Sequence, residues 1–159
     1  MVSSQKKVSV VKATLKDMPD VAKLSIEMLK YHNALLDDYF TMFPYEQYVK
    51  KFTQKLKDKQ CILVAKIDSK VIGFILVEFH KTPHYKFANS CIIDEVVISE
   101  KYRSCGIGTA LFEKALSICK DKKIEEIKLN VYNANARAKY LYERWGFKDL
   151  RQQMSLVLK

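Results

Sequence analysis

The feature that most constrains the fold is a strand, a glycine turn, a helix and a second strand in direct succession. Residues Ser90 to Ile98 are apolar and largely β-branched and predict a strand, and Ile127 to Tyr132 alternate as another. The helix predicted between them, Gly108 to Asp121, makes the unit a crossover, so its two strands should be parallel. The chain is therefore expected to be an α/β protein with a mixed sheet.

The turn inside this unit, Arg103-Ser-Cys-Gly-Ile-Gly108, has the layout of an anion site. Its two glycines let the backbone approach a ligand and adopt positive φ, and the first amides of the following helix have no intrahelical partner. The helix dipole favours an anion by about 0.3–1 kcal/mol, and Arg103 adds positive charge. Leu111 stands where a dinucleotide fingerprint needs glycine, and no P-loop Lys-Ser/Thr pair follows, so both nucleotide-binding classes lose support.

A second motif lies in the helix predicted from Asn135 to Trp145, which ends at Gly146 as a helix C-cap would. Asn135, Ala138 and Tyr142 recur at intervals of three and four, which places them on one helix face. A carboxamide, a small residue and a phenol thus line one groove.

The two motifs together resemble those of the GNAT superfamily of acyl-CoA-dependent N-acetyltransferases. Arg-x-x-Gly-x-Gly follows one strand, and Asn-x-x-Ala-x-x-x-Tyr-x-x-x-Gly-Phe follows the next, in the family's order. The resemblance covers about Lys7 to Leu158 and is specific from Ile92 to Phe147. Ser104-Cys105 replaces the small or basic residues common inside the turn, which matters little because the turn binds through its backbone.

The resemblance implies an activity, transfer of an acetyl group from acetyl-CoA to a primary amine by direct attack in a ternary complex, without a metal. The turn would bind the pyrophosphate, and the strand and the second motif would bind the pantetheine arm and thioester. The implied cofactor-binding residues are Val96, Val97, Ile98, Arg103, Ser104, Cys105, Gly106, Ile107, Gly108, Thr109, Asn135, Ala138 and Tyr142.

Catalytic roles also follow from the resemblance. Tyr142 would donate a proton to the departing thiolate. Deprotonating a lysine-like amine at pH 7 costs about 4.6 kcal/mol, so a base or water relay is needed. An acid on a similar strand serves the amine in relatives, which makes Asp94 the first choice, Glu95 the second and Glu78 a remoter option. Strand alternation predicts that Asp94 and Glu95 point to opposite faces.

The acceptor is expected to meet the irregular segment 32–44, which varies with substrate in the resembled family. Its candidate substrate-binding residues are Asp37, Asp38, Tyr39 and Phe40. An alternative of equal weight is that the aromatic rings merely pack and the acids are merely solvated. The acceptor itself stays open: a small amine, an aminoglycoside, an amino acid, a peptide N-terminus or a protein lysine.

The remaining elements complete a single predicted domain over residues 1–159. We expect a six- to seven-stranded mixed sheet, splayed between its two parallel strands and flanked by about four helices. Thr14 with Asp17 is a capping box before the first helix, Asp68-Ser69 turns a hairpin, and Gly73 marks a bulge or a close approach. The further strands are predicted at 8–13, 61–67 and 71–79, the further helices at about 19–31 and 45–57, and a final hairpin at 147–150 and 154–158.

Composition bounds the alternatives. The net charge is +10, from 28 Lys and Arg against 18 Asp and Glu, which favours anionic partners or simply a solvated lysine surface. The face of the helix predicted at 45–57 that carries Lys50, Lys51, Lys55 and Lys57 is expected to be solvated. No apolar stretch is long enough to span a bilayer and residues 1–7 lack a signal-peptide core, so we expect a soluble, cytoplasmic protein without membrane contact. Four separated cysteines favour free thiols, and the three histidines are expected in solvated loops.

Two other functions remain open at this point. One is a catalytically silent CoA-binding module, which would not require Tyr142 or the acids. The other is a basic nucleic-acid-binding protein, although the lysines are scattered and the aromatic residues fall mostly at core spacing. A homodimer is among the expected partners, because dimers are frequent in the resembled family.

Overall fold

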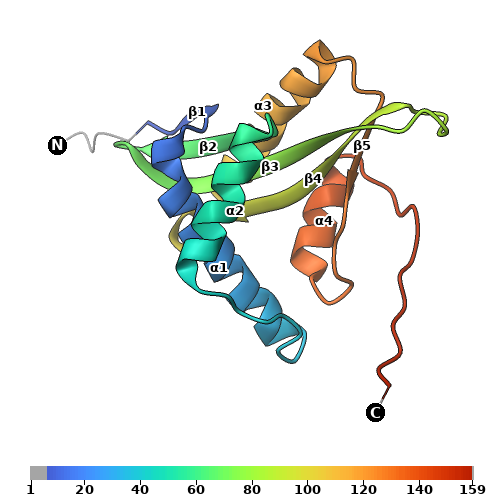
Figure 1. The fold of residues 1–159 in the computed structure, drawn as a ribbon, viewed down its shortest axis with the longest axis horizontal. Helices are drawn as coiled ribbons and strands as arrows, with labels where there is room; N and C mark the ends of the chain where they lie inside the picture. The colour runs from blue at the N-terminus through green and yellow to red at the C-terminus, as the bar shows by residue number, and fades with distance from the viewer. Residues whose placement is uncertain (1–6, 159) are drawn as a thin grey trace.

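The computed structural model describes residues 7–158, and its strands form one mixed sheet (Figure 1). Residues 1–6 and Lys159, which the predicted domain includes, lie outside the described range. The strand order is β1-β2-β3-β4-β5; the first three neighbouring pairs are antiparallel and β4–β5 is parallel, as the crossover predicts. The strands are β1 Ser9–Lys12, β2 Cys61–Ile67, β3 Lys70–Lys81, β4 Asn89–Ile98 and β5 Glu126–Leu129.

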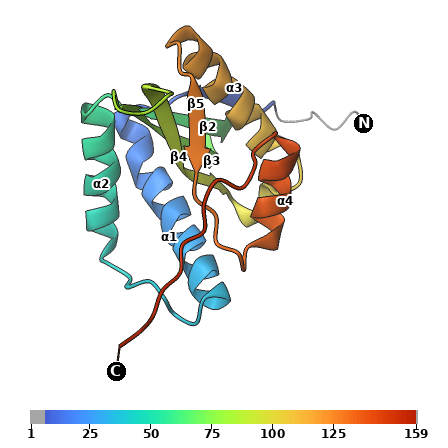
Figure 2. The ribbon, with the colours of Figure 1, turned by 90° about the vertical axis from the view of Figure 1, so that its right-hand side faces the viewer.

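Helices cover both faces of this sheet (Figure 2). The α-helices are α1 Met18–Leu35, α2 Tyr45–Lys57, α3 Ile107–Asp121 and α4 Ala136–Arg144, and the 3-10 helices are η1 Leu15–Asp17 and η2 Glu100–Tyr102. The helices α1 and α2 lie on one face, and α3 and α4 lie on the other. The four expected α-helices are confirmed.

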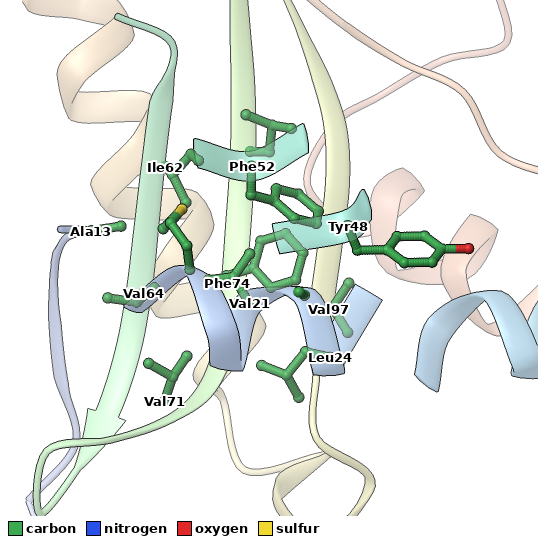
Figure 3. Packing of buried hydrophobic residues seen from close by; sticks show 13 residues of the cluster. Ala13, Val21, Leu24, Tyr48, Phe52, Ile62, Val64, Val71, Phe74 and Val97 are labelled. Atoms are coloured by element: carbon green, nitrogen blue, oxygen red, sulfur yellow. The ribbon is translucent and has the colours of Figure 1, made fainter. Parts of the chain in front are cut away.

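The alternation of buried side chains along the central strands builds two cores. Ile62 and Val64 of β2 face α1 and α2, whereas Leu63 and Ala65 face α3. Figure 3 shows the first core, where the ring of Phe52 meets that of Phe74 edge to face with centroids 5.5 Å apart. Each fully buried ring of this kind stabilises the fold by roughly 1.5–3 kcal/mol.

Several local predictions are confirmed. Asp68 and Ser69 both have positive φ between paired residues Ile67 and Lys70, as a two-residue hairpin turn requires. A Cβ on Gly73 would lie 2.7 Å from Ile98 Cδ1, so this glycine permits a close approach of β3 to β4.

The end of β4 separates from β5. The parallel ladder pairs Ser90 through Ile93 with Glu126 through Leu129, and β4 then continues to Ile98 without a β5 partner. A β-bulge sits at the same point, because Leu76 pairs with Glu95 and Val77 with Ile93, which leaves Asp94 unpaired in the β3–β4 ladder. The expected splay between the parallel strands is therefore present and begins at Asp94.

The predicted C-terminal hairpin is wrong. Residues 147–158 contain no strand, so the described sheet has five strands rather than six or seven. A hairpin is stable only when it buries one face, and here the apolar side chains after Phe147 stay in solvent, with Met154 86% exposed and Leu158 83% exposed. The segment is rich in apolar residues, but after Phe147 none of its side chains is buried against the rest of the fold.

The predicted end of the first helix and the predicted placement of two histidines in loops also need correction. The helix α1 runs to Leu35, so His32 lies in its last turn, and β3 runs to Lys81, so His80 lies in a strand. Both histidines are half-buried rather than solvated. Within the described range, no helix combines the length and the hydrophobicity that a bilayer crossing needs.

Candidate active site

The glycine turn leads directly into α3. Ser104 has a φ of 63°, and Gly106, the N-cap of α3, has a φ of 77°. A Cβ on Gly106 would meet nothing within 4 Å, so glycine is favoured here by its left-handed backbone and not by lack of space. The helix begins at Ile107, one residue before the predicted start.

The N-terminus of α3 is open. Its first closing bond runs from Ala110 N to Gly106 O at 3.0 Å, and in the described structure the amides of Gly106 through Thr109 donate to no protein acceptor. No side chain caps the helix, and its first turn contains no acidic residue. These free amides and the positive end of the helix dipole fit a bound phosphate group.

Two arginines flank this turn. The Nε of Arg103 donates to Ile98 O at 3.1 Å, and its guanidinium lies 5.5 Å from the ring centroid of Tyr31. Arg137, in the first turn of α4, donates from Nη2 to Ser104 Oγ at 3.1 Å. The sequence analysis missed Arg137, although its position inside the second motif was a usable signal.

The second motif lies on α4, close to this turn. Asn135 is the N-cap of α4, and its Oδ1 accepts a hydrogen bond from Ala138 N at 3.2 Å. Its Nδ2 lies 3.4 Å from Nε2 of His32, whose pKa is lowered by burial, so this histidine is neutral at pH 7 and can accept. Asn135 therefore links α4 to the last turn of α1.

Tyr142 packs on the opposite side of α4 from solvent. Its ring lies 5.6 Å from that of Trp145 and 6.2 Å from that of Phe147, and Trp145 stacks on Phe112 of α3 at 4.2 Å. Burial raises the pKa of Tyr142, so its hydroxyl stays protonated at neutral pH. A phenol held in this state can act as a proton donor.

Glu95 is a buried, paired carboxylate. It is 7% exposed; its Oε1 lies 2.7 Å from Lys51 Nζ, and its Oε2 accepts from Ser25 Oγ at 2.8 Å. The side chain thus points between α1 and α2. Lys51 and Ser25 were missed by the sequence analysis, which assigned Lys51 to a solvated face.

Asp94, in contrast, is exposed at the bulge. The strict alternation used to predict its direction does not apply, because the bulge interrupts the strand at this residue. Its charge reaches α2: the pKa of Lys55 is raised by a hydrogen bond to Glu78 and further by the negative charges of Glu78 and Asp94. Glu78, the remoter candidate base, is thereby paired with Lys55.

The predicted acceptor segment closes against the chain that follows β5. Asn33 holds it, accepting from Phe40 N at 2.7 Å and donating to Phe40 O at 2.9 Å. The rings of Tyr39 and Phe40 lie 6.4 and 5.7 Å from that of Tyr132, a residue that the sequence analysis did not select. These rings pack, as one of the two alternatives predicted.

The two acids of this segment are placed differently from the rings. Asp37 and Asp38 have φ values of 51° and 57° and are exposed. Their positive φ comes from the tight turn that ends α1, where Asp38 N donates to Asn33 O at 3.0 Å. Among the described residues, no group of three His, Cys, Asp or Glu side chains could hold a metal ion.

The family model described as the acetyltransferase (GNAT) family matches residues 28–147, which include the turn, β4, α3 and α4. The chain belongs to the GNAT family. It is therefore an acyltransferase enzyme of the N-acetyltransferase type, from a family that generally uses acetyl-CoA as the donor.

Individual relatives agree with this membership. An N-alpha-acetyltransferase of Sulfurisphaera tokodaii is 24% identical over 135 residues, covering 79% of this chain and 75% of the relative. An uncharacterized N-acetyltransferase of Archaeoglobus fulgidus is 27% identical over 141 residues, covering 87% and 90%. The crystal structure of a tetramutant of the BH1408 protein from Bacillus halodurans superimposes with a TM-score of 0.85 at 25% identity, covering 94% of this chain and 99% of that one.

Proposed function

We propose that this GNAT protein transfers an acetyl group from acetyl-CoA to a primary amine by direct attack in a ternary complex. One observation carries the proposal: the N-terminus of α3 is uncapped, free of acidic residues and flanked by Arg103 and Arg137. This arrangement supports the assignment of the diphosphate of CoA to the amides of Gly106 through Thr109.

The end of β4 supports the assignment of the pantetheine arm. From Asp94 to Ile98 this strand has no β5 partner, so the open edge of the segment that contains Val96, Val97 and Ile98 could pair with a ligand amide group. Asn135 and Ala138 lie at the first turn of α4, whose Arg137 touches Ser104. The proposed binding residues therefore come from β4, the turn and α4.

Tyr142 is proposed as the proton donor to the leaving thiolate. Its pKa is raised by burial, so the proton that the thiolate needs is present at neutral pH. The stacking of Trp145 on Phe112 fixes the end of α4 against α3, which holds the phenol in place. Without this proton the thiolate would leave at higher cost.

We further propose that the acceptor is an α-amine, either of an amino acid or of a peptide N-terminus. An α-amine has a pKa near 7.7–8.0, so its deprotonation at pH 7 costs only about 1.0–1.4 kcal/mol, against about 4.6 kcal/mol for a lysine. This difference matters because the carboxylates of Glu95 and Glu78 are already engaged in ion pairs with Lys51 and Lys55. One relative is itself named an N-alpha-acetyltransferase.

Asp94 is proposed to serve this amine, directly or through water, and Glu95 to hold α1, α2 and β4 together. Asp94 is exposed at the point where β4 leaves β5, whereas Glu95 points between the helices. Asp37 and Asp38 would attract the cationic form of the acceptor at the rim. The comparisons give no support to a silent CoA-binding module or a nucleic-acid-binding protein.

The experiment that tests the proposal is a thiol-release assay with acetyl-CoA over a panel of amines. The panel contains free amino acids, short peptides with free and blocked N-termini, N-blocked peptides with one lysine, and polyamines. Turnover with free N-termini and none with blocked ones is expected. Turnover only with lysine side chains would contradict the acceptor assignment.

Three further expectations from the sequence stay predictions: a single domain, a homodimer and a cytoplasmic location.

A further inference from the structure

A groove lies at the end of the molecule opposite the glycine turn. It has a volume of about 400 Å³ and is formed by the chain after α2, the end of β3, the start of β4 and the chain after α3. A smaller hollow of about 180 Å³ adjoins it and shares Lys59, Gln60, Phe79 and Lys122 with it. The larger volume is in the range of small-molecule sites.

The groove is strongly basic. Lys59, Lys81 and Lys122 line it, and Lys12 lines the adjoining hollow. Within the described range none of these four lysines forms an ion pair, although lysines elsewhere, such as Lys66, do pair with carboxylates.

Little negative charge opposes these lysines. Asp58 is the one acid that lines the larger groove, and its Oδ1 accepts from Gln54 Nε2 at 2.8 Å. The C-terminal end of α3 adds a partial negative charge, which three lysines outweigh. Glu125 adds a carboxylate beside the groove, since its Oε2 accepts from Asn89 N at 3.0 Å. The charge of the three lining lysines still exceeds that of these two acids.

Part of this charge is held in position. The Nζ of Lys122 lies 4.8 Å from the ring centroid of Phe79, so a cation–π contact orients the ammonium group at the groove. Gln60 accepts from Phe79 N with its Oε1 at 3.0 Å, which directs the remaining amide NH₂ group away from the strand. A positioned ammonium and an amide donor suit a phosphate oxygen.

A second and independent observation comes from His80, which also lines the groove. Its Nε2 is buried and has no hydrogen-bond partner within residues 7–158, and the same holds for the nearby Thr82 Oγ1. Buried polar atoms without a partner are rare in proteins, and an ordered water or an ion is the common missing partner.

We propose that this groove binds a phosphate-bearing small molecule, with its phosphates between Lys59, Lys81 and Lys122. The site is distinct from the glycine turn, since α3 has 15 residues and its two ends are therefore about 22 Å apart. The volume of about 400 Å³ suits a small molecule better than an extended nucleic acid. The groove is proposed on its own lining residues and not on the acetyl transfer proposed above.

The test is isothermal titration calorimetry of the full chain with ATP and with inorganic tripolyphosphate, in the presence of saturating CoA. CoA occupies the glycine turn, so the remaining heat reports the second site. We expect binding of both probes, weakened at least tenfold by Lys59→Gln combined with Lys122→Gln. The matched control, Lys50→Gln with Lys114→Gln, removes the same charge from exposed positions outside the groove and should change the affinity less than twofold.

The outcomes separate this site from general charge attraction. Equal weakening by the two double variants, or no binding of either probe, would overturn the proposal. Binding of single-stranded RNA without binding of ATP or tripolyphosphate would also overturn it. If CoA itself does not bind, the same titrations without CoA still compare the two double variants, so failure of the proposed enzyme function is distinguishable from failure of the groove.

Discussion

Lys51 of α2 and Glu95 of β4 form an ion pair of 2.7 Å between residues 44 positions apart in sequence. Glu95 is buried and also bound to Ser25 of α1, so one carboxylate joins two helices to the strand that leads to the glycine turn. Glu95, a candidate base from the sequence, is thus also a link between α1, α2 and β4.

The first prediction concerns the two neighbouring acids. Asp94→Asn should lower kcat/KM for the amine at least tenfold with a change in unfolding free energy below about 0.5 kcal/mol, because Asp94 is exposed. Glu95→Gln should instead destabilise the fold by about 1–3 kcal/mol, since it weakens a buried pair. Steady-state kinetics and urea unfolding of both variants check this; an unstable Asp94→Asn with normal turnover would reverse the assignment.

The second prediction concerns the proton donor. Tyr142→Phe keeps the ring contacts with Trp145 and Phe147 and removes only the hydroxyl. We expect kcat to fall at least tenfold while the Kd for CoA changes less than twofold. A variant with full turnover would remove the proton-donor role from Tyr142.

The third prediction concerns the glycine turn. Gly108→Val adds a side chain whose Cβ would lie 4.0 Å from Ile98 Cγ1, an ordinary contact, so the fold should tolerate it. The same side chain would obstruct the open amides of α3, and we expect CoA affinity to fall more than tenfold. Gly108→Ala is the control for size, with a smaller loss expected. Undiminished CoA binding by the valine variant would contradict the assignment of the CoA diphosphate to the amides at the start of α3.

The fourth prediction concerns Arg137, which the sequence analysis missed. Arg137→Gln should raise the KM for acetyl-CoA about three- to tenfold with little change in kcat, because the lost charge lies beside the turn and away from Tyr142. Lys139 lies on the same helix as Arg137 and pairs with Asp149, which follows that helix. Lys139→Gln is therefore the matched control. Equal effects of the two variants would indicate general charge attraction.

The fifth prediction is a pH dependence of stability. Burial opposes ionisation of Asp17, but hydrogen bonds from Lys66 and Thr14 and the charge of Lys66 lower its pKa below the ordinary value. A depressed carboxyl pKa stabilises the fold above the unfolded-state pKa of about 3.9, and this contribution is lost as the pH falls through the folded-state value.

Asp17→Asn measures this contribution. It should cost about 2–4 kcal/mol at pH 7, and the gap to the wild type should shrink below about pH 4. The exposed pair of Asp20 and Lys23 is the control, with Asp20→Asn expected within about 0.5 kcal/mol. A gap that is independent of pH would contradict the role of ionised Asp17.

Local patterns in the sequence predicted most of the fold. Continuous apolar runs located β2, β3 and β4, and alternation located β5. The two-residue turn at Asp68 and Ser69 was recognisable, and the glycines identified the start of α3 within one residue. These features depend on residues close in sequence, so one amino-acid sequence is enough to predict them.

The features that were missed depend on distant partners. The bulge at Asp94 is defined by its pairing with β3, and the partners of Glu95 come from α1 and α2. The C-terminal hairpin failed for the converse reason, since segment 147–158 has strand-like composition but no surface to cover it. Sequence periodicity reports neither kind of relationship.

The most direct test of the central claim is a crystal structure of the protein with CoA. The diphosphate should accept hydrogen bonds from the amides of Gly106 through Thr109, with Arg103 or Arg137 beside it and the thiol end between β4 and Tyr142. A diphosphate bound at any other place, with these amides facing solvent, would contradict the proposed function.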